Sequence, residues 1–569
     1  MAVVGREVKP PRLHPPRLGK PWGAWAAGAA LFALSLLAGG YRVYAGHQSM
    51  QLPLVEWVAD PSLFPHDPFA ATLSRYGAPV WWAIGRATVY FPIETILLSL
   101  FLLEKLCLLL AGAALARALY PGSARAPWAG AAVVAVGICP ILGGGTITKT
   151  YFEQTSASVP FFLWAFAALL QGQPWRWAVA CAAGTALNPL YGVYAVTYSG
   201  LGLLAQHGRR VRAWGLPLLA FAALAAPAFW FAATRTQPGI HADPALWLAA
   251  ARARSAYHLF PLGSGFERLL AFGLLFVTTL VFARGCRAAR FVWAAAAVSA
   301  AWLAFALVAA YVVPGRRLLM LQPPRATDLW YALAGVLLAA QTAAHWEKGA
   351  LRPRGLAPVA LLASLLLLRI PPGSVVVGCT LLLLLHPAVS TRLFRRRALA
   401  YAVIGLAVLG SVAGARRIIT RSAQYRAVTQ EDAQASASVR EAGAWAKTHT
   451  PKEAVFLVPA QMGMFRALSR RSIVSSWQDG GAILWEASFA DKWIERMHAL
   501  GEPVAPAEAG RWPVAASPYP TRWTDQQLEE TGRRFGADFC VLPADHLTRL
   551  PVVFLGQHGL KVVNLLRGR

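Results

Sequence analysis

The stretch Ile93–Leu119, IETILLSLFLLEKLCLLLAGAALARAL, decides the fold class of this chain. It is almost wholly apolar, and a helix of this length crosses roughly 30 Å of hydrocarbon. Similar apolar runs recur through the first three quarters of the 569 residues. The sequence therefore predicts an α-helical polytopic membrane protein rather than a string of soluble domains.

The composition favours the same class. Hydrophobic residues make up 56% of the chain and charged residues only 14%, against roughly 25% charged in soluble domains. Lys and Arg number 54 and Asp and Glu 26, a net charge of +28. In a membrane protein such an excess marks cytoplasmic loops rather than a nucleic-acid surface. We therefore expect a multi-pass membrane protein with no nucleic-acid partner.

We expect about thirteen transmembrane helices from the apolar runs. The predicted spans are Trp22–Tyr41, Ile93–Leu119, Trp128–Leu142, Val159–Leu170, Trp177–Leu187, Leu190–Ala205, Trp214–Ala233, Leu269–Phe282, Phe291–Val313, Leu329–Ala344, Leu356–Leu368, Val375–Leu385 and Ala398–Ala415. Alternate loops are rich in Arg and Lys, which predicts a cytoplasmic N-terminus.

This topology predicts three parts. Residues 1–21 form a basic cytoplasmic tail, residues 22–415 form the transmembrane domain with a long first outer loop at 42–92, and residues 416–569 form a C-terminal domain. Within that loop, Pro79–Tyr90 predicts an interfacial helix with its tryptophans at headgroup level.

The composition changes in residues 416–569. Amphipathic helical patterns alternate there with short apolar runs such as Ala454–Pro459 and Asp538–Leu542, which predicts a small α/β domain. No glycine-rich phosphate loop opens any of its helices, so we expect no nucleotide site there. An odd number of spans places this domain outside the cytoplasm.

The first outer loop contains the residues best suited to chemistry. Its segment His47–Tyr76 reads HQSMQLPLVEWVADPSLFPHDPFAATLSRY. Carboxylates at a membrane surface act as general bases or as ligands of a divalent cation, and imidazoles assist either role. The candidates are His47, Glu56, Asp60, His66 and Asp67. In the alternative interpretation, Asp60 and Asp67 open turns and cap helices, because a proline follows each of them.

Two cations are available on the same predicted side of the membrane. Arg325 lies in QPPRATDLWY, Gln322–Tyr331, where a guanidinium suits a phosphate group. Lys149 follows the glycine-rich start of GGGTITKTYFEQTSAS, although the spacing of a phosphate-binding P-loop is absent. The alternative is that Arg325 pairs with Asp328 or reaches to the interface.

This arrangement resembles the GT-C superfamily of polytopic membrane glycosyltransferases. At residue level, Gln51–Phe69 (QLPLVEWVADPSLFPHDPF) resembles the first loop of an uncharacterised bacterial group of GT-C-like membrane proteins. The stretch Thr450–Gly481, followed by Trp485 and by Trp493–Arg496, is similar to the same group. The architectural resemblance covers nearly the whole chain, whereas the motifs cover only these two patches.

The resemblance implies a glycosyltransferase of a bacterial inner membrane. Such an enzyme moves a hexosyl or pentosyl unit from a polyprenyl-phosphate-linked donor to an acceptor at the periplasmic face. Its catalytic acid maps onto Asp60 or Asp67, and the sequence does not choose between them. The expected substrate-binding residues are Arg325, Lys149, His66, His47 and Glu56.

Departures from the family pattern leave other questions open. There is no Asp-Asp or Asp-Glu pair after the first span and no W-W-D-Y-G motif, which disfavours the oligosaccharyltransferase and protein-mannosyltransferase branches. A divalent cation, Mg²⁺ or Mn²⁺, is an open alternative, with Asp60 and Asp67 as its ligands. Two other functions stay open: a transporter or lipid-handling protein that uses polar residues inside spans, such as Glu104 and Asn188, and a non-catalytic GT-C scaffold for surface-polymer assembly.

Overall fold

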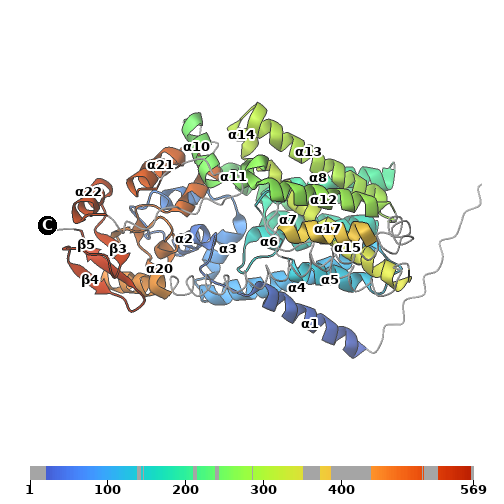
Figure 1. Cartoon of the computed structure of the whole chain (residues 1–569), viewed down its shortest axis with the longest axis horizontal. Helices are drawn as coiled ribbons and strands as arrows, with labels where there is room; N and C mark the ends of the chain where they lie inside the picture. Colours follow the sequence, from blue (N-terminus) through green and yellow to red (C-terminus); the bar gives the residue numbers. More distant parts are fainter. Residues whose placement is uncertain are drawn as a thin grey trace, which may run out of the picture.

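The computed structural model describes residues 21–137, 142–144, 147–208, 214–236, 243–284, 286–349, 372–385, 437–502, 504 and 523–565. A bundle of long helices forms one end of the molecule, and a small mixed sheet with its helices forms the other end (Figure 1). Short helices from the loops lie between the two parts. We call the end of the bundle that adjoins the sheet the domain end.

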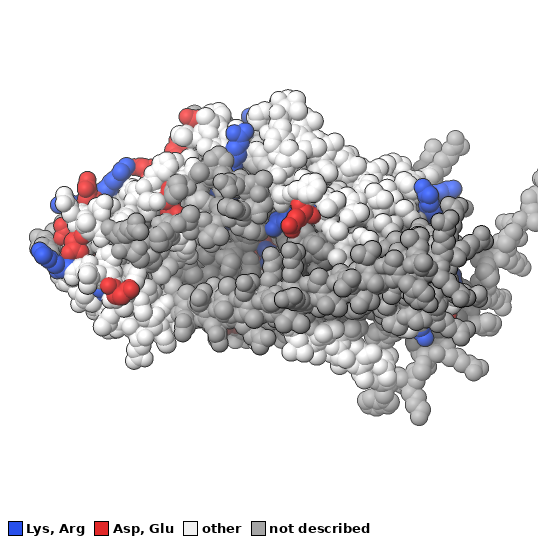
Figure 2. Space-filling view, in the orientation of Figure 1, with Lys and Arg blue, Asp and Glu red and all other residues white. Residues whose placement is uncertain are grey.

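The bundle consists of apolar helices. They are α1 (Pro21–Gly39), α4 (Ile93–Leu119), α5 (Ala126–Val136), α6 (Gln154–Leu170), α7 (Pro174–Leu187), α8 (Pro189–His207), α9 (Gly215–Arg235), α12 (Phe266–Ala283), α13 (Ala289–Leu307), α15 (Thr327–Glu347) and α17 (Pro372–Leu385). Four of them are long and apolar enough to cross a bilayer: α4, α9, α12, and α13 continued by a π-helical turn to Val312. On the face shown in Figure 2, the charged side chains of the described residues are most numerous at the domain end.

The helices coincide closely with the predicted spans. For example, the predicted Leu269–Phe282 lies within α12, and the predicted Leu329–Ala344 lies within α15. A membrane protein built of apolar helices is therefore confirmed, whereas the number of about thirteen spans is not. The predicted spans Leu356–Leu368 and Ala398–Ala415 lie outside the described residues, as does most of the predicted tail at 1–21.

Two glycines allow α4 and α5 to pack closely. A Cβ atom on Gly130 would lie 2.5 Å from the Ala116 Cβ and 2.5 Å from the Gly112 carbonyl oxygen. Helices in a bilayer associate largely through such close backbone contacts between small residues, because lipid offers no hydrophobic drive to pair them.

We expect Gly130→Val to separate α4 from α5, because its side chain has no space between them. Overpacking of this kind costs about 1–3 kcal/mol, so the yield of monodisperse protein and its thermal midpoint in detergent are expected to fall. Gly28→Val is the matched control, since a Cβ at Gly28 meets nothing within 4 Å. An equal yield of both variants would contradict this packing.

The C-terminal residues form the predicted small α/β domain. Its strands are β1 (Val455–Leu457), β2 (Ser472–Ile473), β3 (Phe539–Pro543), β4 (Val552–Leu555) and β5 (Leu560–Asn564), in the order β2-β1-β3-β5-β4. Strand β1 is parallel to β2 and β3, while β5 is antiparallel to β3 and β4. The helices are one over residues 437–449, α20 (Met464–Ser469), η6 (Trp477–Leu484), α21 (Phe489–Ala499) and α22 (Asp525–Phe535).

Local sequence accounts for much of this domain. The apolar run around β1 is buried on both faces, as expected for a central strand. Thr524 starts α22 with a reciprocal capping box to Gln527, and Gly536 ends the helix in the left-handed conformation. Local sequence signals therefore account for the central strand β1 and for both ends of α22.

The remaining short elements pack between the bundle and this domain. They are α2 (Gln48–Ala59), η1 (Ala70–Arg75), α3 (Pro79–Ala87), α10 (Pro244–Arg254), α11 (Ala256–Leu259), η3 (Pro261–Ser264), α14 (Arg316–Leu319) and η5 (Pro323–Ala326). Residues of α2, α3 and α10 share one apolar core with β1, η6 and α21. In addition, the Trp247 indole of α10 donates to the Ile483 carbonyl of η6 at 3.1 Å. The loops thus hold the domain on the bundle.

The helix predicted at Pro79–Tyr90 forms over Pro79–Ala87, but the predicted headgroup position was wrong for Trp81. Trp81 is fully buried, and its indole donates to Gln154 Oε1 at 2.7 Å. Trp82 is only partly buried, and its ring meets Trp57 edge-on. The helix lies against protein on one face because Gln154 of α6 offers a buried acceptor for the Trp81 indole.

Candidate functional site

A cluster of charged and aromatic side chains lies at the domain end of the bundle. We call it the Arg325 cluster. Its members are His47, Lys149, Tyr151, Glu153, Tyr191, Arg254, Tyr257, His258, Arg325 and Asp328. They come from the segment before α2, the loop before α6, α8, α10, α11, η5 and α15. Segments far apart in the sequence therefore meet here.

Arg325 lies at the centre of this cluster. Its terminal nitrogens donate to Gln322 Oε1 at 2.9 Å and to Thr155 Oγ1 at 3.3 Å. Its Nε is buried and has no hydrogen-bond partner among the described residues. The guanidinium also lies over the ring of Tyr191, 5.2 Å from the centroid. A positive charge with an unused donor is thus held in a protein environment, where its field is stronger than in water.

The glycine-rich stretch before Lys149 allows the close approach to Arg325. A Cβ on Gly143 would lie 2.5 Å from the Arg325 Cα, and one on Gly144 would overlap the ring of Tyr257. Gly144 also has a φ of +66°, a conformation that suits glycine. These glycines therefore pack the loop against Arg325 and α11.

Lys149 pairs with Glu153 across one turn of the chain. The backbone carbonyl of Lys149 accepts a hydrogen bond from Lys105 Nζ at 2.9 Å, so α4 also supports this loop. Lys105 and its neighbour Glu104 are both buried, and neither oxygen of Glu104 has a hydrogen-bond partner among the described residues.

Two neutral histidines accompany the cations. His258 Nδ1 lies 2.5 Å from the Gly143 carbonyl oxygen, so Nδ1 is its protonated nitrogen. Burial, followed by the charge of Arg325, lowers the pKa of His258 well below its usual range. Burial also lowers the pKa of His47, with Lys149 and Arg254 adding to the effect. Both rings are therefore uncharged at neutral pH and add polarity without charge.

The N-termini of three helices, which are the positive ends of the helix dipoles, lie next to the Arg325 cluster. Helices α6, α8 and α15 begin at Gln154, Pro189 and Thr327, next to the cluster. Asn188 caps α8 by accepting from the Tyr191 backbone N–H, and its amide donates to Thr155 Oγ1 at 3.1 Å. Helix N-termini together with Arg and Lys make a favourable environment for an anion.

Asp328 supplies the carboxylate closest to Arg325 in sequence. Its Oδ2 accepts a hydrogen bond from the Tyr191 hydroxyl, while its Oδ1 is buried without a hydrogen-bond partner among the described residues. The alternative in which Arg325 simply pairs with Asp328 is therefore not what the structure shows. Asp328 Oδ1 is thus a buried acceptor that no described donor satisfies.

The structure brings together three of the sequence-predicted site residues and separates the other four. Arg325, Lys149 and His47 belong to the Arg325 cluster. Glu56, Asp60, His66 and Asp67 instead contact the C-terminal domain.

Asp67 is fully buried in an ion cluster with Arg466 and Asp479. Its Oδ2 accepts from Arg466 Nε at 2.6 Å and from the Ile473 N–H at 2.9 Å. Its Oδ1 accepts from the N–H groups of Phe69 and Ala70. Four donors saturate this carboxylate, so its position favours a structural role over that of a catalytic base.

Asp60 and His66, like Asp67, contact the C-terminal domain. Asp60 pairs with Lys452 at 3.0 Å, and its side chain is 43% exposed. Hydrogen bonds from Ser62 and Lys452 lower the pKa of Asp60 to about 2. The exposed His66 donates its backbone N–H to Ser472 Oγ at 3.3 Å. Both residues mark the contact between the first long loop and the C-terminal domain.

Glu56 is a carboxylate in an unusual environment at this contact. Its Oε1 accepts from Arg470 Nε at 3.1 Å, and its side chain is only 11% exposed. Burial raises the pKa of Glu56 to about 7, although Arg470 opposes the shift.

Glu56 is expected to make the stability of the protein pH-dependent. A carboxyl whose pKa is raised on folding stabilises the protein fully below its unfolded value and loses that contribution as the pH rises through about 7. Relative to Glu56→Gln, the wild type should thus lose about 1–3 kcal/mol between pH 5 and pH 8. Arg470, Lys447 and Glu94 carry the other charges near this carboxyl. Parallel pH profiles of the thermal midpoints would contradict the expectation.

Asp60 and Asp67 do not fit the ligand pair proposed for Mg²⁺ or Mn²⁺. Asp67 has its oxygens occupied by four donors, and Asp60 faces the ammonium of Lys452. Among the described residues, no three His, Cys, Asp or Glu side chains gather as metal ligands do. This pair of aspartates is therefore poorly suited to bind a divalent cation.

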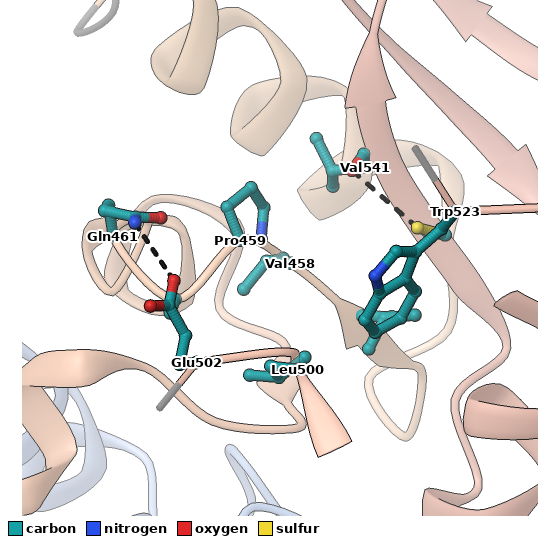
Figure 3. Close-up of a pocket in the computed structure, with 10 residues that line it drawn as sticks. Val458, Pro459, Gln461, Leu500, Glu502, Trp523 and Val541 are labelled. Atoms are coloured by element: carbon teal, nitrogen blue, oxygen red, sulfur yellow. Dashed lines mark hydrogen bonds between the residues drawn. The ribbon is translucent and has the colours of Figure 1, made fainter. Parts of the chain in front are cut away.

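A small cavity lies at the carboxyl end of β1, beside Cys540 and Val541 of the parallel strand β3. Figure 3 shows Val458, Leu500 and Trp523 around it, with Gln461 Nε2 donating to Glu502 Oε1 at 3.2 Å. Its volume of about 10 Å³ suffices for roughly one water molecule. This cavity is therefore not a substrate site.

Several members of the Arg325 cluster were not predicted from the sequence. Arg254 of α10 and Tyr257 of α11 lie in loop helices with no recognisable motif. Glu153, Tyr191, His258 and Asp328 were not placed in the site. Arg254 Nε also donates to the Trp477 carbonyl at 3.0 Å, so it links the cluster to the C-terminal domain. Polar residues at the starts of predicted spans are a signal that could have found Glu153, Tyr191 and Asp328.

Comparisons with known proteins relate the chain to one family and two structures. Residues 437–500 match DUF6798, a domain of unknown function. No curated protein sequence matches the chain significantly. The fold is similar to ArnT from Cupriavidus metallidurans bound to undecaprenyl phosphate, with 13% identity and a TM-score of 0.38 over 96% of this chain and 99% of that one. It is also similar to the Archaeoglobus fulgidus oligosaccharyltransferase in the apo form, with 12% identity and a TM-score of 0.35 over 92% of this chain and 70% of that one.

Proposed function

We propose that this chain is a GT-C-like membrane glycosyltransferase of a bacterial inner membrane. It moves a sugar from a polyprenyl-phosphate-linked donor to an acceptor at the periplasmic face, where the C-terminal domain also lies. The phosphate of the donor binds at the Arg325 cluster. The support for this proposal is the geometry of that cluster together with the apolar helices that carry it.

The convergence of cations and helix N-termini is the observation that carries the proposal. Arg325 and Lys149, which are far apart in the sequence, reach the same place beside the starts of α6, α8 and α15. Arg325 Nε remains without a partner among the described residues. A phosphate monoester or diester at the end of an apolar chain matches such a site, because its lipid tail remains among the bundle helices and its charge meets fixed donors.

The proposed reaction uses the same groups. The acceptor oxygen forms a bond to the anomeric carbon as the bond from that carbon to the donor phosphate breaks. The bonding electron pair goes to the phosphate oxygen, where Arg325 and Lys149 stabilise the growing charge. The proton of the acceptor hydroxyl goes to a carboxylate, and the candidate is Asp328 near Arg325, whose Oδ1 has no hydrogen-bond partner among the described residues.

A transfer assay with paired aspartate variants tests this assignment. The full chain in proteoliposomes is supplied with radiolabelled hexosyl and pentosyl polyprenyl phosphates and with a bacterial membrane extract as acceptor. We expect Asp328→Asn to lower transfer by a factor of about 10²–10⁴, the usual contribution of a general base. Asp60→Asn is the matched control and should retain the activity. Retention in Asp328→Asn with loss in Asp60→Asn would overturn the assignment.

A further inference from the structure

A cavity of about 500 Å³ lies between the first long loop and the C-terminal domain. It lies outside the Arg325 cluster, and its volume is in the usual range for a small-molecule site. The residues that line it are Tyr44, Val55, Glu56, Ala59, Lys447, Ala467, Leu468, Arg470 and those from Thr88 to Glu94.

The cavity is lined by equal numbers of acidic and basic side chains. Two carboxylates, Glu56 and Glu94, face two cations, Lys447 and Arg470. Glu94 accepts from the Tyr44 hydroxyl at 2.7 Å. Glu56 gives only Oε1 to Arg470, and its buried Oε2 has no hydrogen-bond partner among the described residues. A buried carboxylate oxygen without a donor is costly and is satisfied by a ligand that brings one.

One side of the cavity is formed by the segment that leads into α4, a helix long and apolar enough to cross a bilayer. The segment from Thr88 to Pro92 joins the loop helix α3 to the spanning helix α4. Val89, Tyr90 and Phe91 of this segment are exposed by 69%, 79% and 59%. Apolar and aromatic side chains exposed where a span begins are typical of residues that sit among lipid headgroups. A lipid can therefore reach the cavity from the bilayer.

We propose that this cavity binds the headgroup of a zwitterionic phospholipid that carries a primary amine. The phosphate contacts Arg470 and Lys447, the ammonium donates to Glu56 Oε2 and approaches Glu94, and the acyl chains follow Val89 and Phe91 into the bilayer. The site is separate from the proposed donor site and does not depend on the glycosyltransferase function.

The charge pattern separates this ligand from other membrane lipids. An anionic headgroup without an amine would satisfy the cations but would repel both carboxylates. A quaternary choline group has no N–H to donate to Glu56 Oε2. A primary ammonium supplies three donors and a positive charge, and so it complements the carboxylates while its phosphate complements the cations.

Binding of three short-chain lipids to the detergent-purified full chain tests the proposal. The lipids are dioctanoyl phosphatidylethanolamine, phosphatidylcholine and phosphatidylglycerol, each measured by native mass spectrometry and by titration. We expect phosphatidylethanolamine to bind at least about tenfold more tightly than the other two, a difference equivalent to one lost charged hydrogen bond. Equal affinities, or tighter binding of phosphatidylglycerol, would overturn the proposal.

Variants locate the binding. Glu56→Gln is expected to abolish the preference for phosphatidylethanolamine, whereas Glu495→Gln should keep it, because Glu495 pairs with Arg534 on an exposed surface. If Glu56→Gln does not fold, Lys447→Met provides the second test at an exposed position and should weaken the binding of phosphatidylethanolamine. Two results would contradict this site. One is a folded Glu56→Gln that keeps the full preference for phosphatidylethanolamine, and the other is an undiminished affinity of Lys447→Met for that lipid.

Discussion

Replacing Arg466 by methionine is expected to destabilise the protein by about 3–5 kcal/mol, the usual cost of breaking a buried ion pair from one side. Arg466 is fully buried and donates to Asp479 through two nitrogens, at 2.9 and 2.7 Å, and to Asp67 through Nε at 2.6 Å. Its removal leaves two carboxylates buried without a counter-charge. Because Asp67 belongs to the first long loop, the loss also loosens the contact between that loop and the C-terminal domain. The thermal midpoint and the rate of limited proteolysis in detergent measure both effects.

A pair of aspartate variants provides the control. Asp67→Asn should destabilise the protein in the same direction, because it removes the charge that faces Arg466. Asp60→Asn should change the stability by less than about 1 kcal/mol, since the Asp60–Lys452 pair is exposed. A midpoint of Arg466→Met close to that of the wild type, or a larger loss in Asp60→Asn than in Asp67→Asn, would show that the buried cluster does not hold the loop.

Replacing Arg325 by alanine is expected to lower the affinity for a polyprenyl phosphate by about 10–100-fold, since hydrogen bonds from a charged group contribute about 1.5–3 kcal/mol. The affinity for the matching polyprenol, which lacks the phosphate, should not change. Arg325→Lys should recover only part of the loss, because an ammonium lacks the planar fork of donors that a guanidinium offers to phosphate. Titration of undecaprenyl phosphate and undecaprenol into the purified chain makes the comparison.

Arg317→Ala is the matched control for this experiment. Arg317 is exposed and lies in the same segment between α13 and α15. It should therefore leave the affinity for the phosphate unchanged. An equal loss in Arg317→Ala and Arg325→Ala would indicate a general effect of surface charge rather than a phosphate site.

Local patterns were sufficient to predict most elements of the fold. Apolar runs of membrane-spanning length predict helices such as α4, and the strand β3 falls on the predicted Asp538–Leu542. These features depend on periodicity and on residues close in sequence. The interpretation of Asp60 and Asp67 as turn and cap residues was also correct in part, because both accept from N–H groups two residues onward.

The candidate site required tertiary information that no local pattern contains. Asp67 lies 399 residues before its partner Arg466, and nothing in the spacing of either residue indicates this pairing. The same holds for Arg325, whose donors meet Thr155 of α6 across 170 residues. The two stretches Gln51–Phe69 and Thr450–Gly481 pack against one another, and two ion pairs, Arg466–Asp67 and Arg470–Glu56, join them.

Photo-cross-linking tests the central claim most directly, namely that the Arg325 cluster holds the phosphate end of a lipid-linked donor. A polyprenyl phosphate with a diazirine on the isoprene next to the phosphate is activated in proteoliposomes, and the labelled peptides are mapped by mass spectrometry. We predict labels within residues 142–158 and 316–331, and their loss in Arg325→Ala but not in Arg317→Ala. Labels confined to residues 437–565, or unchanged labelling in Arg325→Ala, would contradict the claim.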